Sequence, residues 1–563
     1  MPNIRINEKD NTSPGTPGSY ANYSVLLTGY KGVDRDPIYE NILDADGKYV
    51  KTAKDNVVPD SNGVYEFTSV DDFIKYVGGE KEIVELKDSE GTMLECHYGN
   101  RMARELLSLG YTVIYKPIES VKDMESYDDF WSIFNDKASY DFRFISHGLL
   151  ESCYDETLYE AFSARLKDAE TDFSMFQTIQ TITSKTEDAT DAEAREQAYN
   201  SLLGGDVCDE LLEAIIGKDD HNWFAAYDTG TGQQQSTYPY AQAVERFTAD
   251  EKGNYQAKTI LEEKMTACGA VTPELFDTIN SNIAKLACYR DTVTEAERGR
   301  GDCIALIELD EKDYVKAGRP EANIIDAINS RFDDVVENGA YCALTVPSVY
   351  YKAGKTTKKF PGAFHYLACF MSSLNAGFAE WYAVAGYSRG VSSYSIDRTS
   401  VKLGEIAINA LEPRNIENQA TQPKFACNVI ANFRGNYYLW GNRTAAKVQE
   451  KDAGGDLVAS HFLNIRQLCT TIKKQLYVAC RRFTFDPNSD TLWINFVDAI
   501  APTLDAMKAD QGIRDYKILK VYTDKKATLK AKIRIIPIEA VEDFDLEISL
   551  EDSFGETSAV VTE

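Results

Sequence analysis

Hydrophobic and polar residues alternate most regularly near the end of the chain, in the stretch FDLEISL. The apolar positions share one face of an extended segment, namely Phe544, Leu546, Ile548 and Leu550. A period of two is typical of a β-strand with one buried face. A shorter alternating stretch, NIRIN, places Ile4 and Ile6 on one side of an extended segment near the start. The pattern therefore predicts a strand close to each end of the chain.

Both terminal strands are set apart from the body of the protein. Residues 13–19, SPGTPGS, contain two prolines and two glycines, which exclude regular structure. Pro537 and an acidic run precede FDLEISL. This last strand can pair within its own subunit, or it can add to the sheet edge of a neighbour. We favour addition to a neighbour by both arms, because an apolar strand left unpaired promotes aggregation.

Longer apolar runs and helical periodicities describe the body. Residues 23–30 (YSVLLTGY) predict a buried strand, Ser69 caps a predicted helix, and a further helix ends at Gly110 before a strand. Strands are also predicted at 140–146, 303–309 and 340–351. Between the last two, residues 321–339 predict a helix whose apolar face comprises Ile325, Ile328, Phe332 and Val335. A strand, a helix and a second strand thus follow one another, and both strands are apolar throughout. This order favours a crossover unit with two parallel strands.

The last third of the chain has a different pattern. Residues 456–483 predict one long amphipathic helix that packs on a sheet, with its apolar positions at Val458, Phe462, Ile465, Cys469, Ile472, Leu476 and Ala479. Residues 515–523 and 529–538 then predict an antiparallel hairpin. This hairpin is basic, with Lys517, Lys520, Lys525, Lys526, Lys530, Lys532 and Arg534. From residue 535 to the end there are nine acidic residues and no basic one. An acidic arm beside a basic hairpin of a neighbour is therefore electrostatically favourable.

Composition narrows the function. The 563 residues carry a net charge of −29, which disfavours direct nucleic-acid binding. No apolar stretch is long enough to span a membrane, and the first residues lack a signal-peptide core, so no membrane insertion is expected. The 11 cysteines are scattered, which predicts reduced thiols buried in apolar segments, such as Cys303 in CIALIEL and Cys342 in YCALTV, and a cytosolic compartment.

Three short motifs suggest an enzyme. GYSRG places Ser388 in a GxSxG pattern, with Asp397, Asp456 and His461 following in the order of α/β-hydrolases. The residues after Gly390 lack the apolar stripe of the helix that this motif requires. His147 lies in ISHG without a nucleophile motif to accompany it, and the GKT of residues 354–356 lacks the remainder of a P-loop. The five histidines have no zinc-binding spacing, so neither metal nor cofactor is expected.

Several segments, taken in order along the chain, resemble the family of contractile phage tail sheath proteins. They are YSVLLTGYKG, TSVDDFIKYVGG, YDFRFISHG, YCALTVPSVYY, GNYYLWGNRT and FTFDPNSDTLW. The family's Trp-Gly-Ala-Arg-Thr motif is matched at Trp440, Gly441, Arg443 and Thr444. Asn442 replaces the alanine of that motif, and Val384 stands where the family usually has proline.

The resemblance implies an α/β and α+β multidomain fold. It comprises a central subtilisin-like α/β domain, a C-terminal α+β domain with antiparallel strands, and extended N- and C-terminal arms. The expected segments are an N-terminal arm and linker (1–19), an N-terminal domain (20–125), the subtilisin-like domain with a variable acidic segment (126–425), a C-terminal domain (426–541) and a C-terminal arm (542–563). The subtilisin-like fold accounts for the His147 and Ser388 motifs without catalysis.

The resemblance also implies a structural role with no catalytic residue. Sheath subunits polymerise as stacked rings, usually sixfold, around a tail tube, and contract to drive the tube through the host envelope during genome ejection. The implied partners are further copies of this chain, the tail tube protein, and the baseplate and tail terminator proteins. The implied locations are the virion tail and, during assembly, the host cytoplasm.

Two alternatives remain at this stage. One is an α/β serine hydrolase that uses Ser388 and His461. The other is the sheath of a bacteriocin or secretion-type injection system. The arm contacts are expected at Ile4, Ile6, Phe544, Leu546, Ile548 and Leu550, and the receiving hairpin at Lys520, Lys525, Lys530, Lys532 and Arg534.

Overall fold

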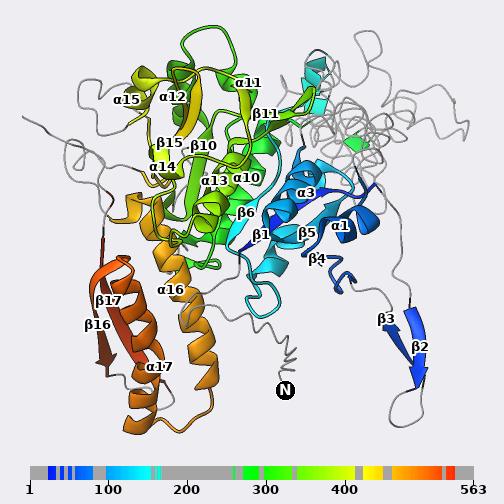
Figure 1. Cartoon of the computed structure of the whole chain (residues 1–563). Coiled ribbons are helices and arrows are strands. Elements are labelled where there is room, and N and C mark those ends of the chain that lie inside the picture. The colour runs from blue at the N-terminus through cyan, green and yellow to red at the C-terminus, as the bar shows by residue number, and fades with distance from the viewer. Residues whose placement is uncertain are drawn as a thin grey trace, which may run out of the picture.

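The structure is a computed structural model of the whole chain (Figure 1). It describes residues 23–32, 39–43, 49–53, 57–79, 97–153, scattered positions between 157 and 167, and then 258–259, 271–290, 297–332, 339–412, 423–447, 459–522, 528–538 and 540. Among these residues, no helix is long and apolar enough to cross a membrane.

One eight-stranded sheet organises the body. Its strands, in spatial order, are β15 (Asn436–Trp440), β14 (Asn428–Phe433), β10 (Cys342–Val346), β9 (Ile304–Ile307), β6 (Phe144–Ser146), β1 (Ser24–Tyr30), β5 (Thr112–Ile118) and β4 (Tyr65–Phe67). The strands from β14 to β5 are parallel, and β15 and β4 are antiparallel edge strands. Every residue of β1, β9 and β10 is buried, as expected for parallel strands covered on both faces.

Helices cover both faces of this sheet and create two cores (Figure 1). On one face lie α10 (Pro273–Ala287), α12 (Pro320–Arg331) and α15 (Glu405–Leu411), and on the other lie α1 (Val70–Tyr76), α3 (Gly99–Leu109) and α13 (Gly362–Asn375). Successive residues of β1 serve different cores: Leu26 packs into the first, and Val25 and Leu27 into the second. The body is therefore a three-layer α/β/α domain.

Smaller elements complete the described chain. A three-stranded sheet contains β12 (Thr356–Phe360), β11 (Val349–Ala353) and β13 (Ile396–Thr399), and two-stranded ribbons join β2 (Tyr39–Leu43) to β3 (Tyr49–Ala53) and β7 (Tyr289–Arg290) to β8 (Glu297–Arg298). Short helical turns are η2 (Val121–Met124), η3 (Tyr127–Trp131), η4 (Ser132–Asn135), α11 (Glu311–Tyr314), η5 (Gly339–Tyr341), α14 (Gly386–Arg389) and η8 (Ala459–His461).

The C-terminal unit consists of a helical pair and a hairpin. Helix α16 (Leu463–Arg482) leads out of the body, α17 (Asp490–Ala509) packs against it, and β16 (Ile513–Val521) and β17 (Lys530–Pro537) form the hairpin (Figure 1). Ser489 caps α17 by accepting a hydrogen bond from the Leu492 amide. The hairpin agrees with the prediction from the sequence, and α17 is an element that the sequence patterns did not indicate.

Many of the predicted elements are confirmed. The Ser69 hydroxyl caps α1 by accepting from the Asp71 amide, and Gly110 ends α3 with φ +97°. The predicted crossover is present, because β9 and β10 are parallel neighbours with α12 between them in the sequence. The predicted buried thiols of Cys303 and Cys342 are free and buried.

Four predictions need correction. The strand expected at 140–146 is confined to β6, and the one expected at 340–351 is two strands, β10 and β11, which belong to different sheets. The helix expected at 321–339 ends at Arg331. It buries Ile324 and Ile328 completely, and Ile325 is half-buried against the same core. Phe332 is buried just beyond this end, and Val335 lies outside the described residues. The long helix begins at Leu463, so Phe462 precedes it, and Val458 lies outside the described residues.

The mixed α/β class is confirmed, while the subtilisin-like assignment and the domain boundaries remain predictions. The eight-stranded sheet takes strands from all three predicted globular segments: β1, β4 and β5 from the first, β6, β9 and β10 from the second, and β14 and β15 from the third.

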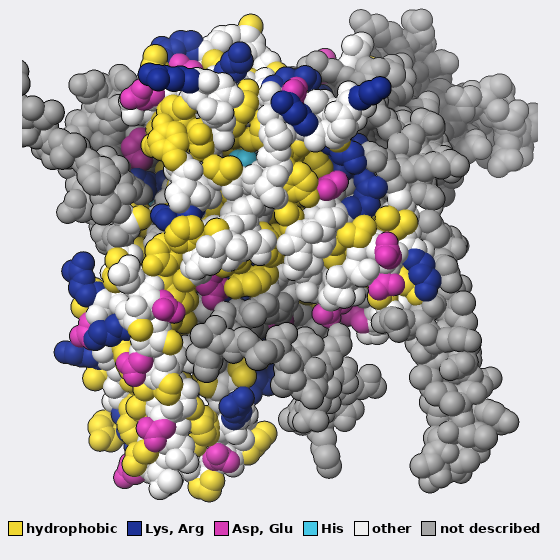
Figure 2. All heavy atoms as spheres, in the orientation of Figure 1, with side chains coloured by type: hydrophobic (Ala, Val, Ile, Leu, Met, Phe, Trp, Pro, Cys, Tyr) yellow, Lys and Arg dark blue, Asp and Glu magenta, His cyan; other side chains and the backbone are white. Residues whose placement is uncertain are grey.

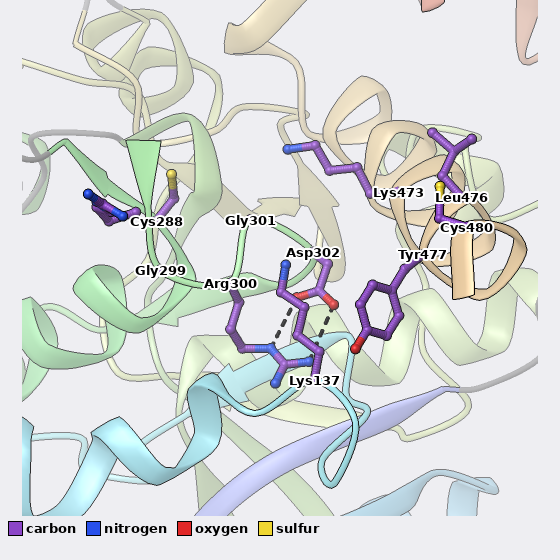
Figure 3. Close-up of a pocket in the computed structure, with 11 residues that line it drawn as sticks. Lys137, Cys288, Gly299, Arg300, Gly301, Asp302, Lys473, Leu476, Tyr477 and Cys480 are labelled. Carbon is purple, nitrogen blue, oxygen red and sulfur yellow. Dashed lines mark hydrogen bonds and ion pairs between the residues drawn. The ribbon is translucent and has the colours of Figure 1, made fainter. Parts of the chain in front are cut away.

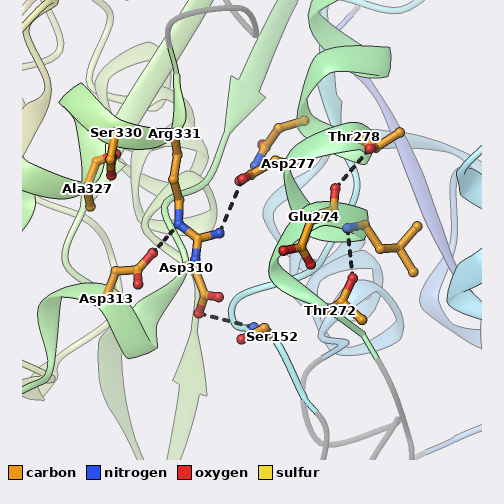
Figure 4. A network of polar contacts seen from close by, with 12 residues as sticks. Ser152, Thr272, Glu274, Asp277, Thr278, Asp310, Asp313, Ala327, Ser330 and Arg331 are labelled. Carbon is orange, nitrogen blue, oxygen red and sulfur yellow. Dashed lines mark hydrogen bonds and ion pairs between the residues drawn. The ribbon is translucent and has the colours of Figure 1, made fainter. Parts of the chain in front are cut away.

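A network around Arg331 joins three helices on one face of the sheet (Figure 4). The guanidinium pairs with Asp313 at 2.7 Å and with Asp277 at 3.2 Å. Burial raises the pKa of the Asp277 carboxyl to about 6, although Arg331 opposes the shift. Arg331 therefore links α12 to α10 through Asp277 and to the α11 turn through Asp313. Burial disfavours the charged form of the Asp277 carboxyl.

Gly362 at the start of α13 provides a test of the packing between this helix and the sheet. A Cβ atom there would lie 1.9 Å from the Thr345 carbonyl oxygen on β10. We expect Gly362→Ala to destabilise the protein by about 2 kcal/mol or more, measured by chemical unfolding. Gly404→Ala is the matched control, since the nearest atom to its Cβ would be 4.0 Å away. Equal stability of the two variants would contradict the predicted clash.

Asp277 provides a pH-dependent test. Its pKa is about 6 in the folded protein against an ordinary 3.8, so the folded state binds the proton more tightly than the unfolded state does. The contribution of this carboxyl to stability is therefore lost as the pH rises from about 4 to about 6. Asp277→Asn cannot lose a proton, so its stability relative to wild type should increase across this window. Thermal unfolding at pH 4 to 8 measures this, and a difference that is independent of pH would contradict it.

Candidate functional site: the C-terminal hairpin and its joint to the body

The inner face of the hairpin packs on the helical pair. Ile518 of β16 lies opposite Ile533 of β17, and Tyr516 lies opposite Ile535. These side chains join a core formed by Leu468 and Ile472 of α16 and by Phe496, Ile500, Leu504 and Met507 of α17. Lys520 lies on this same face, where it forms an ion pair of 2.8 Å with Asp490 in the first turn of α17. The inner face is therefore occupied within the subunit.

The outer face of the hairpin is basic and partly apolar. Cross-strand neighbours on this face are Lys517 with Arg534, Leu519 with Lys532, and Val521 with Lys530. Leu519 is 40% exposed and Ile536, farther along β17, is 53% exposed. Within the described part of the chain, Lys530, Lys532 and Arg534 form no ion pair. Figure 2 shows Lys and Arg side chains gathered along this margin of the C-terminal unit.

The strand edges of the hairpin are also available. Among the described residues, β16 and β17 pair only with each other, so each strand has one edge without a neighbour. Such an edge presents backbone donors and acceptors to which a further strand can add.

The structure describes only some of the residues predicted for this surface. Lys530, Lys532 and Arg534 lie together on the outer face of the hairpin, whereas Lys520 points to the opposite face. Lys525 lies outside the described residues, as do the predicted arm residues Ile4, Ile6, Phe544, Leu546, Ile548 and Leu550. Contact between the arms and the hairpin therefore stays a prediction.

A buried arginine joins the C-terminal unit to the body. Arg143, just before β6, has no exposed side-chain surface and forms an ion pair of 2.5 Å with Glu380, which is 4% exposed. Its guanidinium also donates to Gln467 at 3.1 Å and to Thr471 at 2.8 Å, both on α16. Burial raises the pKa of the Glu380 carboxyl, an effect that the Arg143 charge opposes. Three separate parts of the chain thus meet at one buried cation.

Lys474 makes a second buried connection one turn farther along α16. Its ammonium lies 2.5 Å from Asp141 and 3.6 Å from Asp302, and its side chain is 2% exposed. Asp302 also accepts hydrogen bonds from Arg300, whose guanidinium donates to the Phe134 carbonyl oxygen. The first half of α16 is therefore fixed to the body by polar contacts rather than by an apolar stripe alone.

The pocket in Figure 3 lies beside this connection and has a volume of about 450 Å³. The paired Arg300 and Asp302 line one side of it, and Leu476 and Tyr477 of α16 line the other. Beyond this level α16 leaves the body, and its residues 477, 478 and 480–482 are exposed.

The residues of the Trp-Gly-Asn-Arg-Thr motif connect the edge of the sheet to the start of α16. Gly441 has φ +148° and is packed against Asn428, where a Cβ would be 2.9 Å from the Asn428 Cα. Arg443 forms an ion pair with Glu412 at 3.1 Å, and the Thr444 hydroxyl donates to the Ser460 carbonyl oxygen. Asn442 accepts from the Asn464 amide at 3.0 Å, in the first turn of α16. Trp440 packs on the aromatic rings of Tyr387 and Phe433.

The motifs that suggested an enzyme have structural surroundings. Ser388 is exposed on the short α14 turn, and within the described residues no hydrogen bond joins its hydroxyl to a histidine. His147 is fully buried with its Nε2 3.0 Å from the Asn280 side-chain oxygen, and burial lowers its pKa to about 4. The GKT sequence forms the turn between β11 and β12, not a loop before a helix. Among the described residues, no group of acidic, histidine and cysteine side chains is arranged to hold a metal ion.

No protein-family model and no curated protein sequence matches the chain. Solved structures that resemble it include the contracted sheath complex of PVC, an extracellular contractile injection system, at 10% identity, with 98% of both chains covered and a TM-score of 0.45. The contracted helical sheath of the anti-feeding prophage matches at 11% identity, with 98% of this chain and 99% of that chain covered and a TM-score of 0.45. A structure of the anti-feeding prophage baseplate matches at 15% identity over 57% of this chain and 83% of that chain, with a TM-score of 0.34.

Substitution of Arg143 tests the joint. Arg143→Met leaves Glu380 buried without its cation, so we expect a loss of about 3–5 kcal/mol in unfolding free energy, measured by urea denaturation. Adding Glu380→Gln removes the unpaired charge, so the double variant should be more stable than Arg143→Met alone.

The matched control is Arg319→Met. This arginine pairs with Glu321 at 2.6 Å, but its side chain is 72% exposed. Losing an exposed pair should change stability by no more than about 1 kcal/mol. A double variant as unstable as Arg143→Met would show that the ion pair does not determine the stability of the joint.

Proposed function

We propose that this chain is the subunit of a contractile sheath, a structural protein without catalytic activity that polymerises around a rigid tube. Two observations support the proposal: the order of sequence segments that resemble phage tail sheath proteins, and the two-faced hairpin with open strand edges. The hairpin carries most of the weight, because it gives the predicted terminal strands a place to bind on a neighbouring copy.

The alternation of the C-terminal arm matches the two faces of the hairpin. If FDLEISL of one copy adds to a hairpin edge of another, Phe544, Leu546 and Ile548 extend the inner face that contains Ile518 and Ile533. The acidic residues of the arm then fall on the outer face, beside Lys532 and Arg534. In this one alignment the apolar side chains are buried, the acidic side chains lie beside cations, and the backbone groups form ladder hydrogen bonds.

The energetics of one arm are modest. Each buried apolar side chain contributes roughly 1.5–3 kcal/mol, and each ladder hydrogen bond about 0.5–1.5 kcal/mol. Exposed ion pairs add only about 0–1 kcal/mol each. Ordering the arm costs about 1–2 kcal/mol per residue. A single arm is therefore weak, and a polymer is stable because many arms bind simultaneously.

This arrangement suits a contracting assembly. Head-to-tail contacts that do not close on themselves build helical filaments, here stacked rings that we expect to be hexameric. Arms that stay bound allow the bodies to rotate and repack between a metastable extended state and a contracted one. The proposed partners are other copies of this chain, the tube protein, and the baseplate and terminator proteins. The proposed setting is a phage tail that assembles in the host cytoplasm and ejects a genome.

Truncation of the arm tests the proposal. A chain that ends at residue 543 keeps the described body and C-terminal unit, so we expect wild-type thermal unfolding but no long tubes by negative-stain electron microscopy. The full chain should form hollow tubes. Tubes of normal length from the truncated chain would contradict strand exchange by the C-terminal arm.

Charge reversal on the outer face refines this test. Lys532→Glu combined with Arg534→Glu should weaken tube formation. The matched control is Lys352→Glu combined with Lys355→Glu, two exposed changes on β11 and the turn after it that alter the net charge equally.

Electron microscopy of whole particles that contain this chain distinguishes the two settings. DNA-filled heads on the particles identify a phage tail, and headless particles identify an injection system instead.

A further inference from the structure

A groove between the body and the C-terminal unit is lined with aromatic side chains and has a volume of about 560 Å³. Phe378, Trp381 and Tyr382, which follow α13, line it from the body. Met507 near the end of α17 lines it from the C-terminal unit, and Tyr23, the residue before β1, also lines it. The groove therefore lies next to the point where the N-terminal segment enters the body.

The aromatic wall of this groove is held in place by its own contacts. The rings of Phe378 and Tyr382 lie 5.8 Å apart, and the Arg389 guanidinium lies over both, 5.1 and 5.5 Å from their centroids. The Trp381 indole donates to the Asp510 carbonyl oxygen at 3.1 Å, which connects the wall to the end of α17. Contacts within the chain therefore hold the aromatic wall in place.

The chemistry of the groove favours a proline-rich segment. Aromatic-lined grooves bind the polyproline II conformation, in which proline rings pack between aromatic side chains and little entropy is lost on binding. Glu380 also lines the groove, but its carboxylate is paired with Arg143. Asp510, an exposed residue just after α17, also lines the groove, which therefore offers ring surfaces from the body and one carboxylate from the C-terminal unit.

The chain itself contains a segment of this kind close by. Pro14 and Pro17 are separated by two residues, so in a helix of three residues per turn both rings lie on one side. From Pro17 to Tyr23 is a span of at most about 20 Å, because an extended chain covers about 3.3–3.6 Å per residue. We propose that residues 13–19 of the same chain bind in this groove, with Pro14 and Pro17 against Phe378, Trp381 and Tyr382.

Binding there has a structural consequence. The segment would contact both the body and α17, and so it would fix the direction in which residues 1–12 leave the subunit. The idea that this direction delivers the N-terminal arm to a neighbour rests on the proposed sheath function. Binding of residues 13–19 in the groove does not rest on it, and this binding can be tested on folded chains whether or not they form tubes.

Photo-cross-linking in the full chain tests the site. A photoreactive amino acid replaces Thr16, between the two prolines, and cross-linked peptides are identified by mass spectrometry. We expect links to residues 374–382 or 506–510 within one chain. Replacing Pro14 and Pro17 by alanine should reduce the yield of these cross-links roughly tenfold, as expected when about 1.4 kcal/mol of binding free energy is lost.

Two controls make the result decisive. The first is Pro2→Ala, a proline-to-alanine change outside the proposed segment, which should leave the yield unchanged. The second is a mixture of isotopically light and heavy chains, in which links within one chain carry a single label. Links between light and heavy chains would overturn the assignment to the same chain, and links to other parts of the body would overturn the site.

Discussion

The Arg143 guanidinium, buried where the α/β body meets α16, constrains the whole arrangement. A cation without exposed surface has to be matched by partners in fixed positions, and Arg143 has Glu380 from one segment and Gln467 and Thr471 from α16. Replacing a buried pair by apolar groups is often neutral, but removing one partner is strongly destabilising. The interaction therefore adds little net stability, yet it strongly disfavours any position of α16 in which these groups separate.

This constraint determines how the hairpin is presented. A two-stranded ribbon is only marginally stable alone, so β16 and β17 depend on α16 and α17 for their inner core. Because Arg143 and Lys474 fix the first half of α16, the exposed second half extends outward in a defined direction. The C-terminal unit therefore meets the body through α16 and through the hydrogen bond from Trp381 to Asp510 at the end of α17, and a load on the hairpin edges reaches the body by this path. In the proposed sheath, this path connects the arm of one subunit to the body of the next.

Elements with strong local signals were predictable from the sequence. The strand β1, helix α3 with its Gly110 cap, and the hairpin of β16 and β17 each have one clear period and clear end signals. Helix α17 was missed, although Ser489 precedes apolar residues spaced 4-4-4-3 at Leu492, Phe496, Ile500, Leu504 and Met507. Pro502 inside this helix weakens the signal. The Arg143 joint was not predictable, because its partners Gln467 and Thr471 lie 324 and 328 residues away in the sequence. The same joint buries polar residues of α16 that periodicity assigns to solvent.

Register follows from the same two-faced geometry. In a strand with period two, a slip of one residue moves every side chain to the other face. For the C-terminal arm on the hairpin, such a slip would place Asp545 and Glu547 against the apolar core around Ile518 and Ile533, and Leu546 beside Lys532 and Arg534. Burying unpaired carboxylates is far more costly than losing an exposed ion pair. In the proposed pairing, the outer-face cations would therefore contribute little affinity, but together with the apolar inner face they would restrict the arm to registers that differ by an even number of residues.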